Sequence, residues 1–290
     1  MLDGEIAIDV SLAAELVRTQ FPCWQGLPLR EVRHGGTSHA LFRLGDELAV
    51  RLPRREWAWN EAAKEAAIVP LVAPHVPVAV PEPVALGLPD DRYPYQWSVV
   101  RWIEGDLAPI EDVSENTPFA LAEVVRSLHA MDATDRTWTP NRGRPVTPDD
   151  DEAVRVNIAA LGGSPALTAV WEDALAAPSW DEPGRWLHSD LHVGNLLFRE
   201  GELTGVIDWG SAGVGDPAAN LMTAWLYLDE RGRARFRREL GEFDDATWAR
   251  AGGWALHLAV IALPYYRDTN RFLADIATRT LDQLCPGWDG

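Results

Sequence analysis

The sequence predicts an α+β protein of two lobes, a small antiparallel β-sheet lobe with one helix followed by a larger, mainly helical lobe. Three observations favour this class. Residues 29–52 hold three short strand patterns in succession. Apolar patterning then breaks at Glu104-Gly105-Asp106, and beyond residue 119 the apolar spacing is chiefly that of helices. A chain of 290 residues is long enough for two lobes and a sizeable core.

The first lobe, residues 1–104, begins with a predicted meander. Its strands are LREVR, HALFRL and ELAVRL, joined by HGGTS and by a Gly45-Asp46 turn. Residues 57–69 are rich in helix formers, and Pro70 predicts an end or a kink of that helix. The proline-rich stretch VAPHVPVAVPEPV favours extended connections. QWSVVRWI predicts the last strand, which leads to the boundary between the lobes.

The second lobe, residues 105–290, is predicted to be mainly helical. Residues 119–131, FALAEVVRSLHAM, repeat apolar side chains at helical spacing. The segment 133–151 is polar and contains proline, which favours a loop. After residue 218 the pattern predicts helices to the end of the chain, with the following packing residues: Trp225, Phe236, Trp248 and Trp254.

The net charge of −18 at pH 7 bounds the partners of the protein. So large an acid excess argues against a nucleic-acid backbone or an anionic membrane surface as partner, and it favours a cationic small-molecule ligand. No apolar run approaches the length of a membrane span, so we expect a cytoplasmic protein. Cys23 and Cys285 form no metal-binding or disulfide spacing. The sequence leaves the oligomeric state open.

The stretch WLHSDLHVGNLLF, residues 186–198, sets polar side chains inside an apolar run. Its polar members are His188, Asp190, His192 and Asn195. A buried strand gains little from such residues, because each polar group desolvated without a partner costs about 1 to 3 kcal/mol. These side chains therefore either satisfy one another or carry out chemistry.

Asp208 is expected to lie beside Asn195. The intervening LLFREGELTGVID predicts a hairpin of two apolar strands, which brings both residues to the same end. Carboxylate and amide oxygens suit Mg²⁺, which prefers a few such ligands together with substrate phosphates. Asp190 then suits the residue that orients an acceptor hydroxyl and takes its proton in phosphoryl transfer. The alternative, a structural polar cluster, stays open because a lone Asp near a strand end is usually a cap or part of a turn.

These segments resemble those of a known family. HSDLHVGN followed by VIDWGSAGVGDPAANL is similar to the catalytic and metal-binding segments of the aminoglycoside phosphotransferase family, whose fold is similar to that of protein kinases. GGTSHALFRLGDELAVRLPR resembles the nucleotide-loop region of that family, VPVAVPEPV its small-lobe connection and SLHAMD a large-lobe helix. DDATWARAGGWALHLAVIALPYY resembles a branch that includes macrolide phosphotransferases. The resemblance implies a bilobal, protein-kinase-like fold, with a nucleotide-binding lobe over 1–104 and a catalytic and substrate-binding lobe over 105–290.

The resemblance also implies roles for individual residues. Asp190 matches the catalytic base of the family. Asn195 and Asp208 match its magnesium ligands. His188 matches the residue of the catalytic segment that supports the loop, and Asp216 matches an aspartate that we interpret as further structural support.

Some positions depart from the family's pattern or have no assigned role. Ser189 stands between His188 and Asp190, where the family usually has glycine, and Asn220 stands where relatives often carry an acid. Neither change removes a catalytic group. For His192 a packing role and a substrate-side role both stay open, with packing favoured.

The nucleotide site implied by the resemblance lies in the first lobe. Arg51 stands on the third strand, where the family commonly has a phosphate-binding lysine, and arginine can bind phosphate bidentately. Glu65 aligns best as its helix partner, with Glu61 second. The alternative, that Arg51 is a surface residue at a strand edge, stays open. The other nucleotide contacts are expected from a glycine loop over the phosphates and from the connector that faces the base: Gly35, Gly36, Thr37, Ser38, Val100 and Trp102.

Together these features predict a small-molecule kinase that uses Mg²⁺ and moves the γ-phosphoryl group of ATP or GTP to a hydroxyl. The acidic stretch 149–152 suggests an amine-bearing acceptor such as an aminoglycoside or macrolide antibiotic, but we favour solvated charge at a helix start as its explanation. A second hypothesis is a kinase of a metabolite such as a sugar, a choline-like amine or an amino alcohol. A third is a pseudokinase that binds nucleotide without transfer. The presence of Asp190, Asn195 and Asp208 argues against the third, whereas Arg51 in place of lysine favours it.

Overall fold

The computed structural model describes residues 6–32, 38–107 and 114–288. The chain forms two compact units. The first comprises Met1–Pro74, Ala79–Glu104 and Val206–Gly210, and the second comprises His75–Val78, Gly105–Gly205 and Ser211–Gly290. The short segment Val206–Gly210 thus belongs to the first unit, although the sequence analysis placed it in the second lobe.

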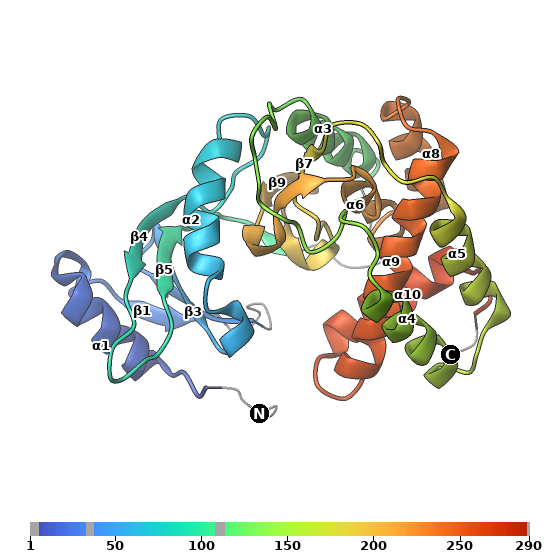
Figure 1. Ribbon diagram of the computed structural model, residues 1–290. Helices are drawn as coiled ribbons and strands as arrows, with labels where there is room; N and C mark the ends of the chain where they lie inside the picture. The colour runs from blue at the N-terminus through green and yellow to red at the C-terminus, as the bar shows by residue number, and fades with distance from the viewer. Residues whose placement is uncertain (1–5, 33–37, 108–113, 289–290) are drawn as a thin grey trace. The chain divides into compact units, whose positions relative to one another are not determined.

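The first unit is built on a five-stranded sheet with the strand order β1-β2-β3-β5-β4 (Figure 1). All of its neighbouring strands are antiparallel. The three strands of the predicted meander and the later strand of QWSVVRWI are confirmed. Gly45 between β2 and β3 has φ 61°, a left-handed conformation that suits glycine in a tight turn. The strands are β1 (Leu29–Glu31), β2 (His39–Leu44), β3 (Leu48–Pro53), β4 (Pro83–Gly87) and β5 (Trp97–Arg101).

Two helices belong to the first unit, α1 (Val10–Gln20) and α2 (Glu61–Val72). The sequence analysis missed α1, whose buried face packs into one core with strands β2, β3 and β5. The helix predicted over 57–69 begins later, because Glu56–Ala58 forms a separate 3₁₀ turn. Pro70 does not end α2 but lies within its last turn, where a missing N–H removes only one helical hydrogen bond.

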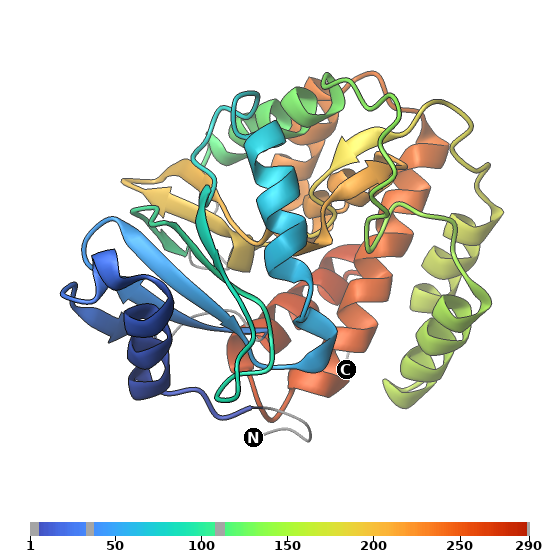
Figure 2. The same ribbon diagram turned by 60° about the vertical axis from the view of Figure 1, so that its left-hand side comes forward.

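The second unit is mainly helical and is organised around the long helix α9. Figure 2 shows α9 running through this unit, where it contacts α4, α5, α6 and α10. Its helices are α3 (Thr117–His129), α4 (Pro148–Ala160), α5 (Pro165–Ala176), α6 (Ala218–Leu221), α7 (Thr223–Leu226), α8 (Glu230–Glu239), α9 (Asp245–Tyr266) and α10 (Arg271–Leu284). The remaining strands are β6 (Asp106–Leu107), β7 (Arg185–Leu187), β8 (Leu196–Arg199), β9 (Glu202–Val206) and β10 (Gly213–Gly215).

The predicted helix over 119–131 is confirmed as α3, and the helices after residue 218 are confirmed as α6 to α10. The loop predicted over 133–151 is wrong at its end, because α4 begins at Pro148. Thr147 and Asp150 form a capping box there, in which each side chain bonds the backbone of the other residue. Of the predicted packing residues Phe236, Trp248 and Trp254 are buried, and Trp225 packs its ring 6.1 Å from that of Trp248.

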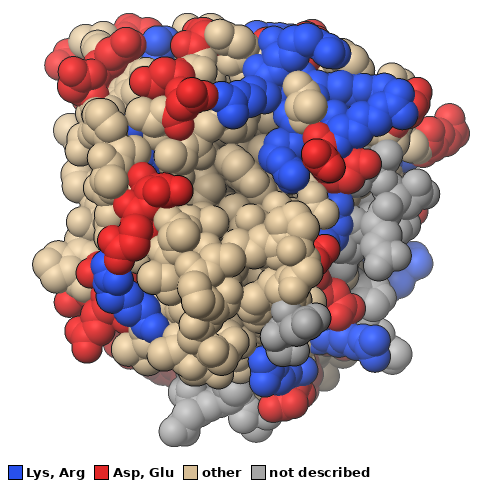
Figure 3. Space-filling view, turned by 90° about the vertical axis from the view of Figure 1, so that its right-hand side faces the viewer, with Lys and Arg blue, Asp and Glu red and all other residues tan. Residues whose placement is uncertain are grey.

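Charge is unevenly spread over the surface. Lys and Arg side chains gather over the upper part of the face turned to the viewer in Figure 3, while the middle of that face carries few charges. Helix α8, with the sequence ERGRARFRRE, contributes five arginines to the second unit. The acid excess is therefore a property of the whole chain and not of every face. Among the described residues, no helix is long and apolar enough to cross a membrane.

Candidate functional site

The segment His188–Asn195 connects β7 to the next strand of the second unit, β8. Strand β7 is fixed on one side by β10, with Trp186 opposite Val214. The apolar residues of the segment, such as Leu191, are fully buried. The polar side chains therefore occupy a connection that is fixed at both ends, and not the strand interior in which they would be costly.

Asn220 holds the start of this connection in place. Its Oδ1 accepts the backbone N–H groups of His188 at 2.9 Å and of Ser189 at 3.2 Å. Its Nδ2 donates to the carbonyl oxygen of Trp186 at 3.3 Å and lies 3.2 Å from Nε2 of His129. Asn220 has no exposed surface. This departure from the family's pattern is therefore a buried structural support, which the sequence analysis did not recognise.

Ser189 has a left-handed backbone with φ 60°. This conformation costs a residue with a side chain roughly 1 to 2 kcal/mol, which explains why glycine is usual at the position. The Ser189 hydroxyl donates to the carbonyl oxygen of Ser211 at 2.7 Å. Serine thus offsets the strain with a hydrogen bond that glycine cannot form.

The carboxylate of Asp190 is held on both of its oxygens. Oδ1 lies 3.2 Å from Nη1 of Arg142. Oδ2 lies 3.3 Å from Nδ2 of Asn195, which also donates to the carbonyl oxygen of Asp190 at 2.9 Å. Nε2 of His192 lies 3.6 Å from Oδ2. Asp190 and Asn195, predicted from sequence to act together, are thus brought into contact.

These neighbours set the charge of Asp190. Burial alone raises the pKa of the carboxyl, but His192, Arg142 and His188 lower it by more, so that its pKa lies well below the ordinary range. The carboxylate is ionised at neutral pH and can accept a hydrogen bond from a hydroxyl.

The two histidines of the segment lie beneath and beside the carboxylate. His188 is fully buried, so it cannot contact a substrate, and its position suits the supporting role implied by the resemblance. His192 accepts the backbone N–H of Gly194 at Nδ1, 3.1 Å away, and its Nε2 lies 3.3 Å from Nδ2 of Asn195. Of the two roles left open for His192, the structure favours packing within the loop.

The predicted hairpin between Asn195 and Asp208 is confirmed. Strands β8 and β9 pair within a three-stranded sheet of order β6-β8-β9. The turn between them, Glu200-Gly201, has φ of 55° and 81°, as a tight two-residue hairpin requires. Asn195 directly precedes β8, and Asp208 follows the end of β9. Among the described residues, no group of three or more His, Cys, Asp and Glu is arranged to hold a metal ion.

Arg51 in the first unit forms a buried ion pair with Glu65 of α2. The side chains of Arg51 and Glu65 are 10% and 5% exposed, so the alternative of a surface arginine is excluded. Nη2 of Arg51 also lies 3.5 Å from Oδ1 of Asp208. Burial lowers the pKa of the guanidinium, but Glu65 and Asp208 raise it by more, so Arg51 stays charged.

Glu61 is a second buried acid in the first unit, and it does not form the ion pair with Arg51. One of its carboxylate oxygens lies 3.7 Å from Nδ1 of His39. Burial, with the charges of Asp208 and Glu65, raises the pKa of Glu61 to about 8. The raised pKa favours the protonated form of Glu61, while Glu65 is the glutamate that forms the ion pair with Arg51.

The predicted glycine loop is described by the structure only at its last residue, Ser38. Gly35, Gly36 and Thr37 lie outside the described residues. Ser38 is buried, and its hydroxyl lies 2.9 Å from Nδ1 of His39.

Val100 lies inside β5, between β3 and β4, with a buried side chain. Trp102 follows the strand. The backbone N–H of Trp102 donates to the carbonyl oxygen of Glu47 at 2.8 Å. The indole ring of Trp102 lies 4.7 Å from the Arg43 guanidinium. Of this pair of predicted connector residues, Trp102 alone lies outside the sheet.

The acidic stretch 149–152 begins α4, as the favoured interpretation expected. Asp150 pairs with Arg144 at 2.6 Å. Asp151 accepts hydrogen bonds from Trp171 Nε1 at 2.7 Å and from Arg155 at 2.8 Å. Two of the four acids are therefore already neutralised within the protein.

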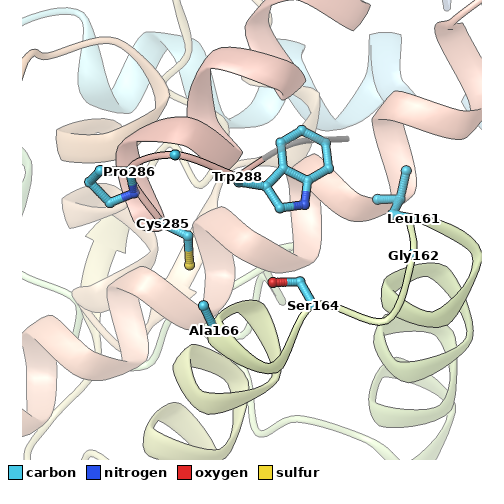
Figure 4. A pocket seen from close by; sticks show the side chains of 8 residues that line it. Leu161, Gly162, Ser164, Ala166, Cys285, Pro286 and Trp288 are labelled. Atoms are coloured by element: carbon cyan, nitrogen blue, oxygen red, sulfur yellow. The ribbon is translucent and has the colours of Figure 1, made fainter.

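A cavity of about 250 Å³ lies where the α4–α5 turn meets the C-terminal segment (Figure 4). Its lining includes the buried thiol of Cys285 and the indole of Trp288. None of the predicted site residues belongs to this cavity.

Comparison with known proteins decides the family. Residues 29–254 match the model of the phosphotransferase enzyme family. The chain belongs to this family. The match includes both the Arg51 region and the Asp190 segment, so the family recognised from the sequence motifs is confirmed.

Two curated proteins match part of this chain. The uncharacterised protein YcbJ of Bacillus subtilis is 24% identical over 184 residues, covering 61% of this chain and 58% of that protein. An aminoglycoside 3'-phosphotransferase of Escherichia coli is 28% identical over 123 residues, covering 38% of this chain and 43% of that protein. The chain thus spans about half the length of the relatives it matches.

Solved structures share the fold of this chain over nearly its whole length. The GDP and kanamycin complex of APH(2")-IIia is 19% identical with a TM-score of 0.70, and the match covers 94% of this chain and 97% of that one. The macrolide 2'-phosphotransferase MphH of Brachybacterium faecium is 23% identical with a TM-score of 0.58, covering 97% and 99%. The predicted fold class is confirmed.

Proposed function

We propose that this chain is a Mg²⁺-dependent small-molecule kinase that moves the γ-phosphoryl group of ATP or GTP to a hydroxyl of an amine-bearing compound such as an aminoglycoside or a macrolide. The observation that carries the proposal is the setting of Asp190. Its ionised carboxylate sits in a connection fixed by Asn220 and is held by Asn195 and Arg142. A carboxylate fixed in this way can orient an acceptor hydroxyl and receive its proton as the phosphoryl group is transferred.

The residues assigned to the metal fit a hard cation. Nδ2 of Asn195 is engaged by Asp190, so the amide oxygen of Asn195 is the atom left to face an ion. Asp208, which follows the hairpin, supplies a carboxylate that is partly exposed. Mg²⁺ bound by these oxygens would neutralise charge that develops on the β- and γ-phosphates.

The phosphate-holding role falls to Arg51. Its ion pair with Glu65 fixes the guanidinium, and arginine binds phosphate oxygens bidentately where lysine offers a point charge. Ser38 and Trp102 are assigned as further nucleotide contacts on the family's pattern alone. Support for a nucleotide donor comes from the family itself, in which related structures were solved as GDP and ATP complexes.

The acceptor is proposed on two grounds. The net charge of −18 attracts cationic compounds, and related structures were solved with kanamycin, gentamicin or streptomycin. A second candidate, a kinase of a sugar or an amino alcohol, is favoured by the neutralised acids at the start of α4. Asp150 and Asp151 are occupied by Arg144, Arg155 and Trp171, which leaves less free negative charge there for a polyamine.

Mass spectrometry of a compound panel tests the proposal. Aminoglycosides, macrolides and small amino alcohols would be incubated with the protein, Mg²⁺ and either ATP or GTP. A phosphoryl mass gain on an aminoglycoside or a macrolide, absent with Asp190→Asn, is the expected result. A gain on an amino alcohol alone would favour the second candidate. Nucleotide binding without any gain across the panel would count against the antibiotic acceptors and would favour an unlisted metabolite or a pseudokinase.

A further inference from the structure

Arg142 touches the carboxylate that the proposed function makes the catalytic base. Its Nη1 lies 3.2 Å from Oδ1 of Asp190 and 3.4 Å from the carbonyl oxygen of Ser189. The side chain of Arg142 is 17% exposed, so most of the guanidinium is withdrawn from water. Arg142 comes from the polar loop between α3 and α4. The sequence analysis assigned no role to Arg142 itself.

The loop that carries Arg142 is fixed to residues on either side of β10. Asn141 donates to Ser211 twice, from its backbone N–H at 3.3 Å and from Nδ2 at 2.8 Å. On the other side of Arg142, the carbonyl oxygen of Gly143 accepts the N–H of Asp216 at 2.8 Å. Arg142 is thus flanked on both sides by residues bonded to the segments that precede and follow β10, the strand that pairs with β7.

At Gly143 the loop backbone packs closely against Leu187 of β7. It has φ 83°, and a Cβ at this position would lie 2.7 Å from a methyl carbon of Leu187 in β7. Asp216, which bonds the Gly143 carbonyl, is itself held by Arg250 at 2.6 Å and 3.2 Å. The position of the loop is therefore determined by packing and by a partly buried ion pair.

We propose that Arg142 is a positioning residue for Asp190, which fixes the rotation of the carboxylate by holding Oδ1 while Asn195 holds Oδ2. The inference rests on the proposed function, because it concerns the same reaction. With Arg142 on Oδ1 and Asn195 on Oδ2, the carboxylate plane is held in one rotation. The free lone pairs of the two oxygens then face an acceptor hydroxyl in one orientation. Loss of this contact lets the carboxylate rotate, which lowers the rate of transfer without removing any group that binds the nucleotide.

Hydrolysis of ATP or GTP in the absence of an acceptor tests the role, because water then takes the place of the hydroxyl. We expect Arg142→Gln to lower kcat for phosphate release by about tenfold or more, with KM for the nucleotide within about twofold of wild type. We expect Arg142→Lys, which keeps a cation, to recover kcat to within about threefold. Equal kcat in wild type and Arg142→Gln would overturn the inference. A variant that raises KM for the nucleotide and leaves kcat unchanged would also overturn it.

Arg144→Gln is the matched control. Arg144 lies in the same loop and also pairs with an aspartate, Asp150, at 2.6 Å. If Arg142 acts only by holding the loop, both variants should lose kcat alike. The positioning role instead predicts that Arg144→Gln lowers the melting temperature while kcat stays within about twofold of wild type.

A crystal structure separates failure of this inference from failure of the proposed function. If wild type releases no phosphate from either nucleotide, the result counts against the proposed function. The claim that Arg142 fixes the rotation of the Asp190 carboxylate can still be checked. The inference expects the Asp190 carboxylate to be turned or disordered in Arg142→Gln and fixed in wild type and in Arg142→Lys. An unchanged carboxylate in Arg142→Gln would refute it.

Discussion

Two arginines, one in each unit, are bound to carboxylates of the candidate site, and they differ in how they are held. Arg51 lies on a central strand and pairs with a helix residue 14 positions later, Glu65, with both side chains nearly buried. Arg142 lies on a loop and pairs with Asp190, 48 positions later, with both side chains partly exposed. The first pair is built into regular secondary structure, and the second is built by docking a loop.

Site residues on regular strands and helices, such as Arg51, can be predicted from the sequence more readily than site residues on docked loops, such as Arg142. A strand followed by a helix fixes where Arg51 and its partner lie, so periodicity and a family motif are enough to pair them. The position of Arg142 depends on contacts with Ser211 and Asp216, which are about 70 residues away along the chain. Local patterns carry no signal for such contacts.

The largest effect on stability is expected from Arg51→Gln, which breaks the buried ion pair with Glu65. The variant leaves Glu65 buried without its cation, and breaking a buried pair on one side costs about 3 to 5 kcal/mol. Urea unfolding measures the change. Arg18→Gln, which breaks the exposed pair with Glu15, is the control and should cost less than about 1 kcal/mol. Similar small losses in both would contradict the buried-pair account.

A smaller, pH-dependent effect is expected from Glu61→Gln, next to the same pair. The pKa of Glu61 is raised from 4.5 to about 8, so between these values the folded protein keeps a proton that the unfolded chain has lost. This group therefore makes the free energy of unfolding fall as pH rises through that range. Because glutamine does not titrate, we expect the variant to gain on the order of 3 to 4 kcal/mol relative to wild type between pH 5 and pH 8.

Urea unfolding at several pH values in EDTA measures this gain. Glu15→Gln is the matched control. Glu15 is exposed and its pKa is lowered, so its contribution is constant above pH 5 and the control should show no slope. A flat difference for Glu61→Gln would show that Glu61 is ionised at neutral pH and competes with Glu65 for Arg51.

The smallest effect is expected from Ser189→Gly, which probes the loop beneath Arg142 and Asp190. Glycine relieves the strain of φ 60° but loses the hydrogen bond to Ser211, and the two changes nearly cancel. We expect a change in unfolding free energy of less than about 1 kcal/mol. Ser189→Ala keeps the strain and loses the bond, so it should cost about 1 kcal/mol more than Ser189→Gly. Equal stability of the two variants would contradict this view.

Much of the fold and part of the site could be predicted from the sequence. The meander and the hairpin between Asn195 and Asp208 follow from local pattern, whereas the Arg51–Glu65 pair was implied by the resemblance to the family. The family motif added roles for Asp190 and its neighbours, and these roles stay predictions.

Other features could not be predicted, for physical reasons. The start of α4 depends on a capping box within a stretch that looks like a loop. Helix α1 is different, because Asp9 caps it and its buried residues Ala13, Leu16 and Val17 have helical spacing, so the sequence did carry a signal for it. Asn220 supports the Asp190 segment through buried backbone hydrogen bonds that only the folded chain brings together. The start of α4 and the role of Asn220 thus depend on capping or on tertiary contacts, whereas α1 was marked by its apolar periodicity and was overlooked.

The most direct test of the central claim compares Asp190→Asn with Arg51→Gln in two assays, nucleotide affinity by calorimetry with Mg²⁺ and the rate of phosphoryl release in a single turnover. The account predicts that Asp190→Asn keeps the Kd within about twofold and lowers the rate by about a hundredfold or more, because a general base contributes that much. Arg51→Gln, studied at a temperature at which it is folded, should raise the Kd by about tenfold, as expected for the loss of a charged phosphate contact. An unchanged rate in Asp190→Asn would contradict the account.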